Sequence, residues 1–220
     1  MNAKPRIAIT MGDPAGIGPE IIAKVHERSE PFRSCDPLVV GSARVLEKII
    51  AELRLPLAVR GIPSPDAADS GPGRIEVLDL DNVDLEKHAW GRPNAASGKA
   101  VVEYIKKAVE LATRREVDAI TTAPINKEMM NAAGYDYAGH TELLAALTNS
   151  KDFGMMFVGG GLKLILATIH HPLKDVPALI KKDRVLRTIR LAHVAMKGFG
   201  ADHPRIGVAA LNPHASEGGL

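Results

Sequence analysis

Short apolar runs rich in β-branched residues recur along the 220-residue chain, and each leads into a polar or glycine-rich loop. These runs are RIAIT (6–10), DPLVVG (36–41), VDAITTA (117–123), KLILATI (163–169) and RIGVAAL (205–211). Between several of them, apolar residues recur every three or four positions, as they do on one face of a helix. Strands that alternate with helices predict βαβ units, so we expect an α/β fold with a largely parallel sheet.

Two stretches carry the clearest helical pattern. Residues 97–115 place an apolar stripe on one face, and Ser97 is the expected N-cap. Residues 183–200 repeat the pattern, and we expect this helix to stop at Gly198 or Gly200. The segment 63–94 is rich in Pro, Gly, Asp and Asn and interrupts the alternation of strand-like and helical stretches. It contains one strand-like run, RIEVLDL. We expect it to be a surface excursion or an antiparallel arm.

Composition narrows the class of protein. The net charge of +2 and an aromatic content of only 4% argue against a nucleic-acid binder, which would need a basic surface or stacking platforms. The single cysteine, Cys35, cannot form an internal disulfide, which fits a reducing compartment. No signal-peptide-like or membrane-spanning run is present, so we expect a cytoplasmic protein of one large or two small domains.

The first loop, MGDPAGIGPE at 11–20, has glycines that match neither the GxGxxG dinucleotide spacing nor a Walker loop. A turn that leads into a helix starting near Pro19 remains, with free backbone amides facing the loop. Such a turn could hold an anionic group of a substrate. Alternatively, Asp13 and Glu20 could be structural anchors.

Two further loops follow the strand at 117–123. In TTAPINK, Asn126 and Lys127 open a short helix, and Lys127 either contacts a carboxylate or phosphate or is a solvated surface charge. In AGHTELL, His140 lies just before a helix expected to start at Thr141. The positive end of that helix would keep His140 neutral and able to hydrogen-bond a substrate, although a packed loop histidine is the alternative.

Two histidines follow predicted strands farther along the chain. His170 ends LILATIH and His214 ends VAALNPH, so both are expected at the mouth of the sheet, where they could share a divalent metal. A third ligand would have to come from another loop, another chain or sequence outside the 220 residues. His171 is expected to point elsewhere. The remaining histidines, expected on the surface or in helices, are His26, His88, His193 and His203.

Taken in order, MGDPAGIGPE, TAPINK, GHTE, TIHHPL and LNPHASEGG resemble the 4-hydroxythreonine-4-phosphate dehydrogenase family of vitamin B6 biosynthesis, over residues 6–219. The resemblance implies a fold like that of isocitrate and isopropylmalate dehydrogenases, with two α/β/α domains around a cleft, in a homodimer with shared active sites. It also implies oxidation of 4-phosphohydroxy-L-threonine by NAD or NADP, followed by decarboxylation to 3-amino-2-oxopropyl phosphate.

Residue roles follow from the same resemblance. It places substrate binding on His140 and Thr141, and binding of a divalent cation such as Zn, Mg or Co on His170 and His214. Asp13, Lys127 and Asn212 are further expected cleft residues. Members of the family are about half as long again, so residues 1–220 are expected to form the N-terminal two thirds of a dehydrogenase. The third metal histidine, a substrate-holding lysine, asparagine and arginine, and much of the cofactor site would lie beyond.

Two alternatives stay open. A paralogue could apply the same chemistry to a phosphorylated threonate or erythronate, or to a dihydrodiol carboxylate. The second alternative is a protein of another class. It would be a non-catalytic remnant that keeps these motifs and binds metal or phosphate but oxidises no substrate.

Overall fold

The computed structural model describes residues 4–218. The chain divides into two compact units, one ending at Asn149 and the other beginning at Ser150. Each unit is described by itself. No helix within residues 4–218 is long and apolar enough to cross a membrane.

Unit 1 is built on a five-stranded parallel sheet with strand order β3-β4-β2-β1-β5. Its strands are β1 (Arg6–Thr10), β2 (Asp36–Gly41), β3 (Ala58–Gly61), β4 (Arg74–Asp79) and β5 (Ala119–Thr122). Ala8 of β1 pairs with Leu38 on one side and Ile120 on the other. Val39 and Val40 of β2 are fully buried, as expected for a central strand covered on both faces. The expected largely parallel sheet is confirmed.

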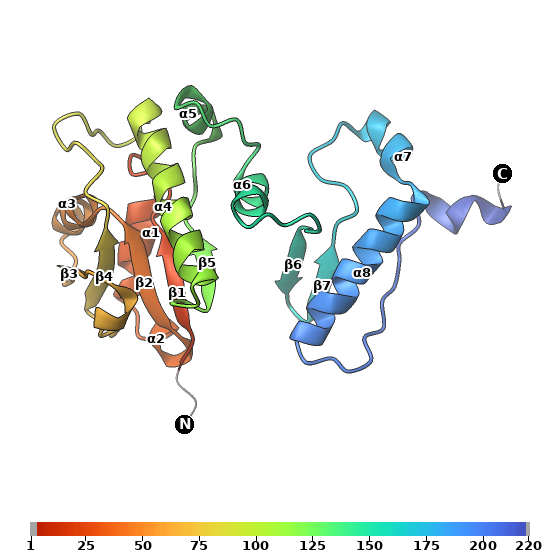
Figure 1. Ribbon diagram of the computed structural model, residues 1–220, viewed down its shortest axis with the longest axis horizontal. Helices are drawn as coiled ribbons and strands as arrows, with labels where there is room; N and C mark the ends of the chain where they lie inside the picture. The colour runs from red at the N-terminus through yellow and green to blue at the C-terminus, as the bar shows by residue number, and fades with distance from the viewer. Residues whose placement is uncertain (1–3, 219–220) are drawn as a thin grey trace. The chain divides into compact units, whose positions relative to one another are not determined.

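Helices cover both faces of this sheet (Figure 1). The helices of unit 1 are α1 (Gly18–His26), α2 (Pro31–Ser34), α3 (Ala43–Leu53), η1 (Pro65–Ala67), α4 (Ala95–Thr113), α5 (Lys127–Ala132) and α6 (His140–Leu147), and the last two pack against α4. Helices α1 and α3 pack together, and α3 contacts β3 and β4, whereas α4 lies over β1, β2 and β5. Unit 1 is therefore a three-layered α/β/α structure, and each helix that follows a strand begins at the carboxyl edge of the sheet.

The structure corrects two details of the sequence prediction. Strand β4 is a parallel inner strand between β3 and β2, not part of a surface excursion or antiparallel arm. Helix α4 begins at Ala95 with Asn94 as its N-cap, and Ser97 completes the capping box instead of being the cap itself. Both residue types cap helices, so the sequence alone did not separate two candidates three positions apart.

Unit 2 is smaller and more open. A hairpin of β6 (Met156–Gly159) and β7 (Leu162–Ile165) is followed by η2 (Leu173–Asp175), α7 (Val176–Leu179), α8 (Lys182–Gly198) and η3 (Pro213–Gly218). The end of α8 at Gly198 was predicted. The strand expected at 205–211 is not formed, since those residues belong to no sheet.

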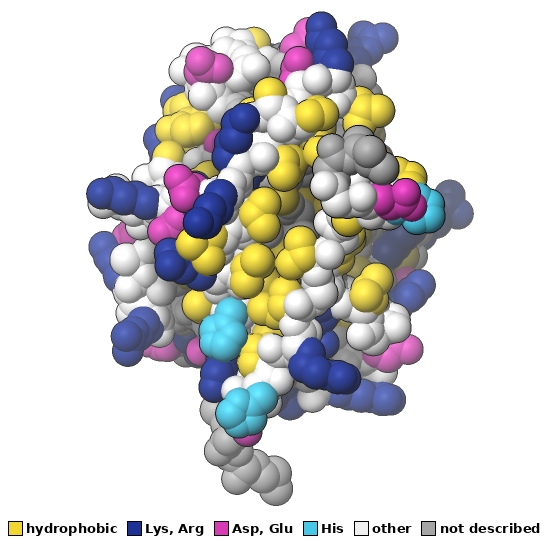
Figure 2. Space-filling view, turned by 90° about the vertical axis from the view of Figure 1, so that its right-hand side faces the viewer, with side chains coloured by type: hydrophobic (Ala, Val, Ile, Leu, Met, Phe, Trp, Pro, Cys, Tyr) yellow, Lys and Arg dark blue, Asp and Glu magenta, His cyan; other side chains and the backbone are white. Residues whose placement is uncertain are grey.

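Apolar side chains of unit 2 remain accessible. Ala192, which is 5% exposed, is the only buried residue among positions 150–218. Apolar side chains gather in a hollow on the face shown in Figure 2. A groove of about 340 Å³ runs between β7, α7, α8 and residues 206–211. Unit 2 therefore has little core of its own.

Candidate functional site

The loop after β1 owes its glycines to close backbone packing. Gly12 has φ +72°, and a Cβ there would lie 2.3 Å from the carbonyl oxygen of Pro124. A Cβ on Gly18 would lie 2.2 Å from the carbonyl oxygen of Met11. Only glycine fits such contacts without moving the backbone. These glycines therefore allow the loops after β1 and β5 to pack closely against each other. This packing explains why the loop contains glycines, without a nucleotide-binding motif.

Asp13 stabilises the conformation of the same loop through hydrogen bonds. Its side chain is 5% exposed, and Oδ1 accepts a hydrogen bond from the Ala15 amide at 2.9 Å. The Asp13 amide donates to the Pro124 carbonyl at 2.9 Å. Between the two roles expected for Asp13, these contacts favour the structural anchor. Glu20, the other candidate anchor, forms an ion pair with Lys24 on the surface of α1.

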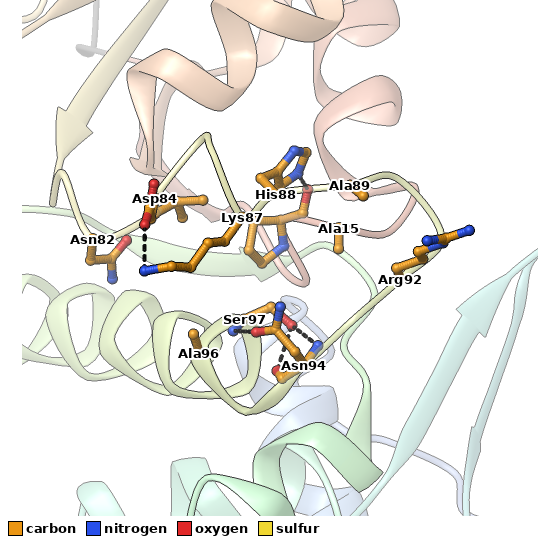
Figure 3. Close-up of a pocket in the computed structure, with 12 residues that line it drawn as sticks. Ala15, Asn82, Asp84, Lys87, His88, Ala89, Arg92, Asn94, Ala96 and Ser97 are labelled. Carbon is orange, nitrogen blue, oxygen red and sulfur yellow. Dashed lines mark hydrogen bonds and ion pairs between the residues drawn. The ribbon is translucent and has the colours of Figure 1, made fainter.

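A pocket of about 290 Å³ opens next to this loop (Figure 3). Pro14 and Ala15 of the loop after β1 form one wall, and the segment 82–92 after β4 forms another. The first turn of α4 closes the third side. All three elements meet at the carboxyl edge of the sheet, where ligands of open α/β folds bind.

Asn82 is held in a fixed orientation at one end of the pocket. The hydroxyl of the fully buried Tyr104 donates to Asn82 Oδ1 at 2.8 Å. Asn82 Nδ2 in turn donates to Glu103 at 2.7 Å. Burial raises the pKa of Tyr104, so its hydroxyl keeps the proton that it donates. One amide hydrogen and one lone pair of Asn82 are left for a ligand.

His88 ties the two loops of the pocket together. Its Nε2 lies 2.8 Å from the Pro14 carbonyl oxygen, and its Nδ1 lies 3.2 Å from Lys48 Nζ. These partners fit a ring that donates from Nε2 to the carbonyl oxygen and accepts at Nδ1 from the ammonium group. The edge of the ring meets Trp90, with centroids 4.5 Å apart. His88 is thus a half-buried loop residue, not the surface or helix residue that was expected.

The other histidines outside the motifs were expected on the surface or in helices, and the structure agrees with this only in part. His26 lies in a helix as predicted, but it is 1% exposed and belongs to the interior. His193 lies on α8, and His203 is exposed.

Lys127 and His140 come together at a second position in unit 1. Asn126 caps α5 by accepting from the Met129 amide at 3.1 Å, which sets Lys127 in the first turn. A Cβ on Gly139, the residue before His140, would lie 3.3 Å from Lys127 Cε. Lys127 of α5 therefore lies beside the start of α6, next to His140.

His140 has the properties of a ligand-facing group. It is the first residue of α6, so the helix begins one position before the predicted start at Thr141. Its Nε2 is buried with no hydrogen-bond partner among residues 4–218. Burial lowers the pKa of His140, and the positive charge of Lys127 lowers it further. A neutral imidazole with an unused buried nitrogen beside a cation is suited to hydrogen-bond an anionic, hydroxylated molecule. Thr141 follows in the same helical turn and is half-buried.

The expected metal ligands lie in unit 2. His170 is exposed, in a bend with φ +52°, five residues beyond the end of β7. His214 is exposed too, with Nδ1 3.6 Å from Glu217 Oε1, and Asn212 donates to Ser216 at 2.8 Å. Neither histidine directly ends a strand, which corrects that part of the prediction. His171 is also exposed.

Imidazole is a suitable donor for borderline cations, and His170 and His214 are accessible. Residues 4–218 nevertheless contain no group of three His, Cys, Asp or Glu side chains arranged for a metal ion. The described chain therefore supplies two donors of the right kind, and further ligands would have to come from elsewhere.

The sequence interpretation missed the pocket residues Asn82, Lys87 and Arg92. A signal was present, because polar residues cluster directly after the run RIEVLDL. Had that run been interpreted as a parallel inner strand, its carboxyl end would have pointed to the same sheet edge.

Fold and polar loops together define an α/β protein of the isocitrate and isopropylmalate dehydrogenase type. The sequence matches the family described as "Pyridoxal phosphate biosynthetic protein PdxA" over residues 33–220. The chain therefore belongs to the PdxA family.

Comparisons with individual proteins support the same family assignment. The chain is 45% identical over 219 residues to the 4-hydroxythreonine-4-phosphate dehydrogenase of Trichlorobacter lovleyi, covering 99% of this chain and 65% of that protein. It is 40% identical over 220 residues to a Symbiobacterium thermophilum protein named "Putative D-threonate 4-phosphate dehydrogenase", covering 100% and 66%. A crystal structure of 4-hydroxythreonine-4-phosphate dehydrogenase from Klebsiella pneumoniae superposes with a TM-score of 0.91 at 39% identity, covering 100% and 66%. The chain thus spans about two thirds of these relatives.

Proposed function

We propose that this chain forms the larger part of an NAD- or NADP-dependent dehydrogenase that oxidises 4-phosphohydroxy-L-threonine in pyridoxal 5'-phosphate biosynthesis. The name of the Trichlorobacter relative at 45% identity supports the substrate. The observation that carries the proposal is the buried, unpartnered Nε2 of His140 beside Lys127, within motifs that follow the carboxyl edge of the sheet.

The proposed roles follow from the site. Lys127 would pair with an anionic group of the substrate, and neutral His140 and Thr141 would hydrogen-bond and orient its polar groups. When bound, the dinucleotide supplies the hydride acceptor, so the substrate's secondary alcohol becomes a ketone and the 3-oxo acid loses carbon dioxide. The product would be 3-amino-2-oxopropyl phosphate.

We also propose that His170 and His214 bind a divalent cation such as Zn, Mg or Co, in a homodimer whose subunits share active sites. When bound, such a cation polarises a substrate hydroxyl. The exposed imidazoles support the donor assignment. The relatives' greater length supports the view that residues outside this chain complete the metal and cofactor sites.

The test is a chimera in which residues 1–220 replace the matching part of the Trichlorobacter relative, with the unmodified relative as reference. We expect reduction of the dinucleotide with 4-phosphohydroxy-L-threonine. His140→Ala should lower kcat/KM about 100-fold, whereas His203→Ala, at an exposed position outside the motifs, should not. A chimera that folds but reduces no dinucleotide would favour the non-catalytic alternative.

The second candidate substrate is D-threonate 4-phosphate, favoured by the name of the Symbiobacterium relative at 40% identity. This compound carries a hydroxyl where phosphohydroxythreonine carries an amine. If the chimera turns over the threonate and not the amino acid, while the unmodified relative does the reverse, the first assignment is wrong.

The metal assignment has a separate readout. Metal content of the purified chimera should fall in His170→Ala and in His214→Ala, and stay unchanged in His171→Ala. Full metal content in both of the first two variants would contradict the ligand assignment.

A further inference from the structure

Helix α4 supports both of the short helices that carry the His140 site. Helix α5 begins with Lys127 and helix α6 with His140, and both pack against α4 (Figure 1). Met130 of α5 and Leu143 of α6 are buried in one apolar cluster with residues of α4. The position of Lys127 relative to His140 therefore depends on how the two short helices pack on α4.

The contact between α4 and α5 is closest at Gly98. A Cβ on Gly98 would lie 2.0 Å from the carbonyl oxygen of Met129 and 2.7 Å from the amide nitrogen of Met130. Both neighbours are backbone atoms, which cannot turn aside as the end of a flexible side chain can. Any side chain at Gly98 therefore forces α5 away from α4 by about 1 Å.

Two further contacts fix the start of α5. Asn126 Oδ1 accepts from the Met129 amide at 3.1 Å and caps the helix. Two residues earlier, the Pro124 carbonyl accepts from the Asp13 amide at 2.9 Å. Helix α5 has only six residues, and a helix this short is not stable through its own hydrogen bonds. Its place in the fold is therefore set by these neighbours.

Lys127 is the residue whose position this packing determines. Its Cε and Nζ lie 3.3 and 3.6 Å from the position of a Cβ on Gly139, directly before His140. Glu142 Oε2 lies 3.7 Å from the same point, so a carboxylate is close to the ammonium group. Across residues 4–218 no ion pair or hydrogen bond holds the Lys127 side chain. The backbone of α5 therefore determines where its charge lies.

We propose that Gly98 and Asn126 are positioning residues, which place the positive charge of Lys127 beside His140 through the backbone of α5. Gly98 acts by leaving room for the Met129 carbonyl, and Asn126 acts by capping the helix. A displacement of about 1 Å at a reacting group can cost an enzyme about 100-fold in rate. The placement stands on the packing of unit 1, and its importance for catalysis rests on the proposed function.

The titration of His140 tests the placement in the 220-residue chain without any turnover. Burial lowers the pKa of His140, and the positive charge of Lys127 lowers it further. NMR of the chain with isotope-labelled histidine follows this pKa, and the signal of His140 is the one that is lost in His140→Gln. Lys127→Met should raise the pKa of His140, because the nearby positive charge is removed.

Gly98→Ala should raise the pKa of His140 towards the value in Lys127→Met, because α5 carries the charge away. In the Lys127→Met background, Gly98→Ala should leave the pKa of His140 unchanged. A merely structural effect, such as looser packing around His140, would raise the pKa in that background as well and would contradict the proposal. The matched control is Gly198→Ala, at the last residue of α8, where nothing lies within 4 Å of the added Cβ. This control should titrate like the parent chain.

Asn126 provides a second pair of variants, which serves if Gly98→Ala does not fold. Asn126→Ala removes the cap and should raise the pKa of His140. Asn126→Ser keeps an accepting oxygen and should restore most of the parent value. Parent-like titration of His140 in Asn126→Ala and in a folded Gly98→Ala would overturn the proposal, and so would equal shifts in Asn126→Ala and Asn126→Ser.

The chimera separates this proposal from the proposed function. Gly98→Ala should lower kcat/KM of the chimera about 10- to 100-fold, with no further loss in the Lys127→Met background. If His140 titrates as expected while the chimera oxidises nothing, the proposed reaction fails and the placement of Lys127 stands. If the chimera is active and Gly98→Ala changes neither kcat/KM nor the titration, the positioning role fails and the proposed function stands.

Discussion

At the scale of single residues, His26 is a buried base inside the α/β core. Its Nδ1 lies 2.8 Å from the Ile22 carbonyl oxygen, while Nε2 is buried and has no hydrogen-bond partner among residues 4–218. Burial lowers the pKa of His26, and the hydrogen bond to Ile22 offsets only part of that effect. A proton on Nε2 would therefore be buried without an acceptor.

We expect this histidine to make unfolding easier in mild acid. Because the folded pKa lies below the unfolded value of about 6.5, the unfolded state binds more protons below that pH. The free energy of unfolding should be level above about pH 6.5 and fall as the pH drops towards the folded pKa. Urea titrations across this range should show the loss in the parent chain and a smaller one in His26→Leu. The exposed His203→Leu should behave like the parent, and a parent-like pH dependence in His26→Leu would contradict the assignment.

Gly12 offers a second test at this scale. Gly12→Ala combines a positive φ with a Cβ 2.3 Å from the Pro124 oxygen, so we expect a loss of about 2–4 kcal/mol in unfolding free energy. Gly61→Ala is the matched control, since nothing lies within 4 Å of its added Cβ. Equal urea midpoints for the two variants would show that the loops after β1 and β5 are not packed as described.

At the scale of elements, local signals predicted most of unit 1. Parallel strands and long helices follow from apolar periodicity, which is why β1, β2, β5 and α4 of unit 1 could be predicted, and α8 of unit 2 as well. The placement of β4 could not, because pairing with β2 and β3 is a long-range choice that the run RIEVLDL does not encode by itself. The pocket was missed for the same reason, since it depends on where β4 lies.

The start of α4 is a testable case of local chemistry. Asn94→Ala removes the side chain that accepts from the Ser97 amide, and should lower the unfolding free energy by about 1 kcal/mol. Asn94→Asp keeps an accepting oxygen and should retain most of the stability. Chemical denaturation measures both variants. A loss in Asn94→Asp as large as in Asn94→Ala would mean that capping is not what Asn94 contributes.

At the scale of the whole molecule, the two units differ in how much apolar surface they bury. Unit 1 has a continuous core from both faces of its sheet, whereas unit 2 has one buried residue among positions 150–218. The run RIGVAAL has a strand-like pattern but no paired neighbour, which shows that a pattern predicts a strand only where a partner edge is present.

We expect the backbone amides of unit 2 to exchange with solvent much faster than those of unit 1, because opening it exposes little additional apolar surface. Hydrogen–deuterium exchange of the intact chain, resolved by peptide, measures this directly. Amides of β2 and α4 serve as the internal reference for slow exchange. Protection in α8 equal to that in α4 would contradict the expectation.

Trp90 is the sole tryptophan of the chain, and its indole meets His88, which lines the pocket beside the loop after β1. Its Nε1 donates to Glu52 at 2.7 Å, and the Lys48 ammonium lies 5.5 Å from its ring centroid. Indole emission depends on such nearby charges and rings. Anything that enters the pocket and shifts His88 should thus change the fluorescence of the protein, so the molecule carries a built-in optical reporter of occupancy at this edge of the sheet.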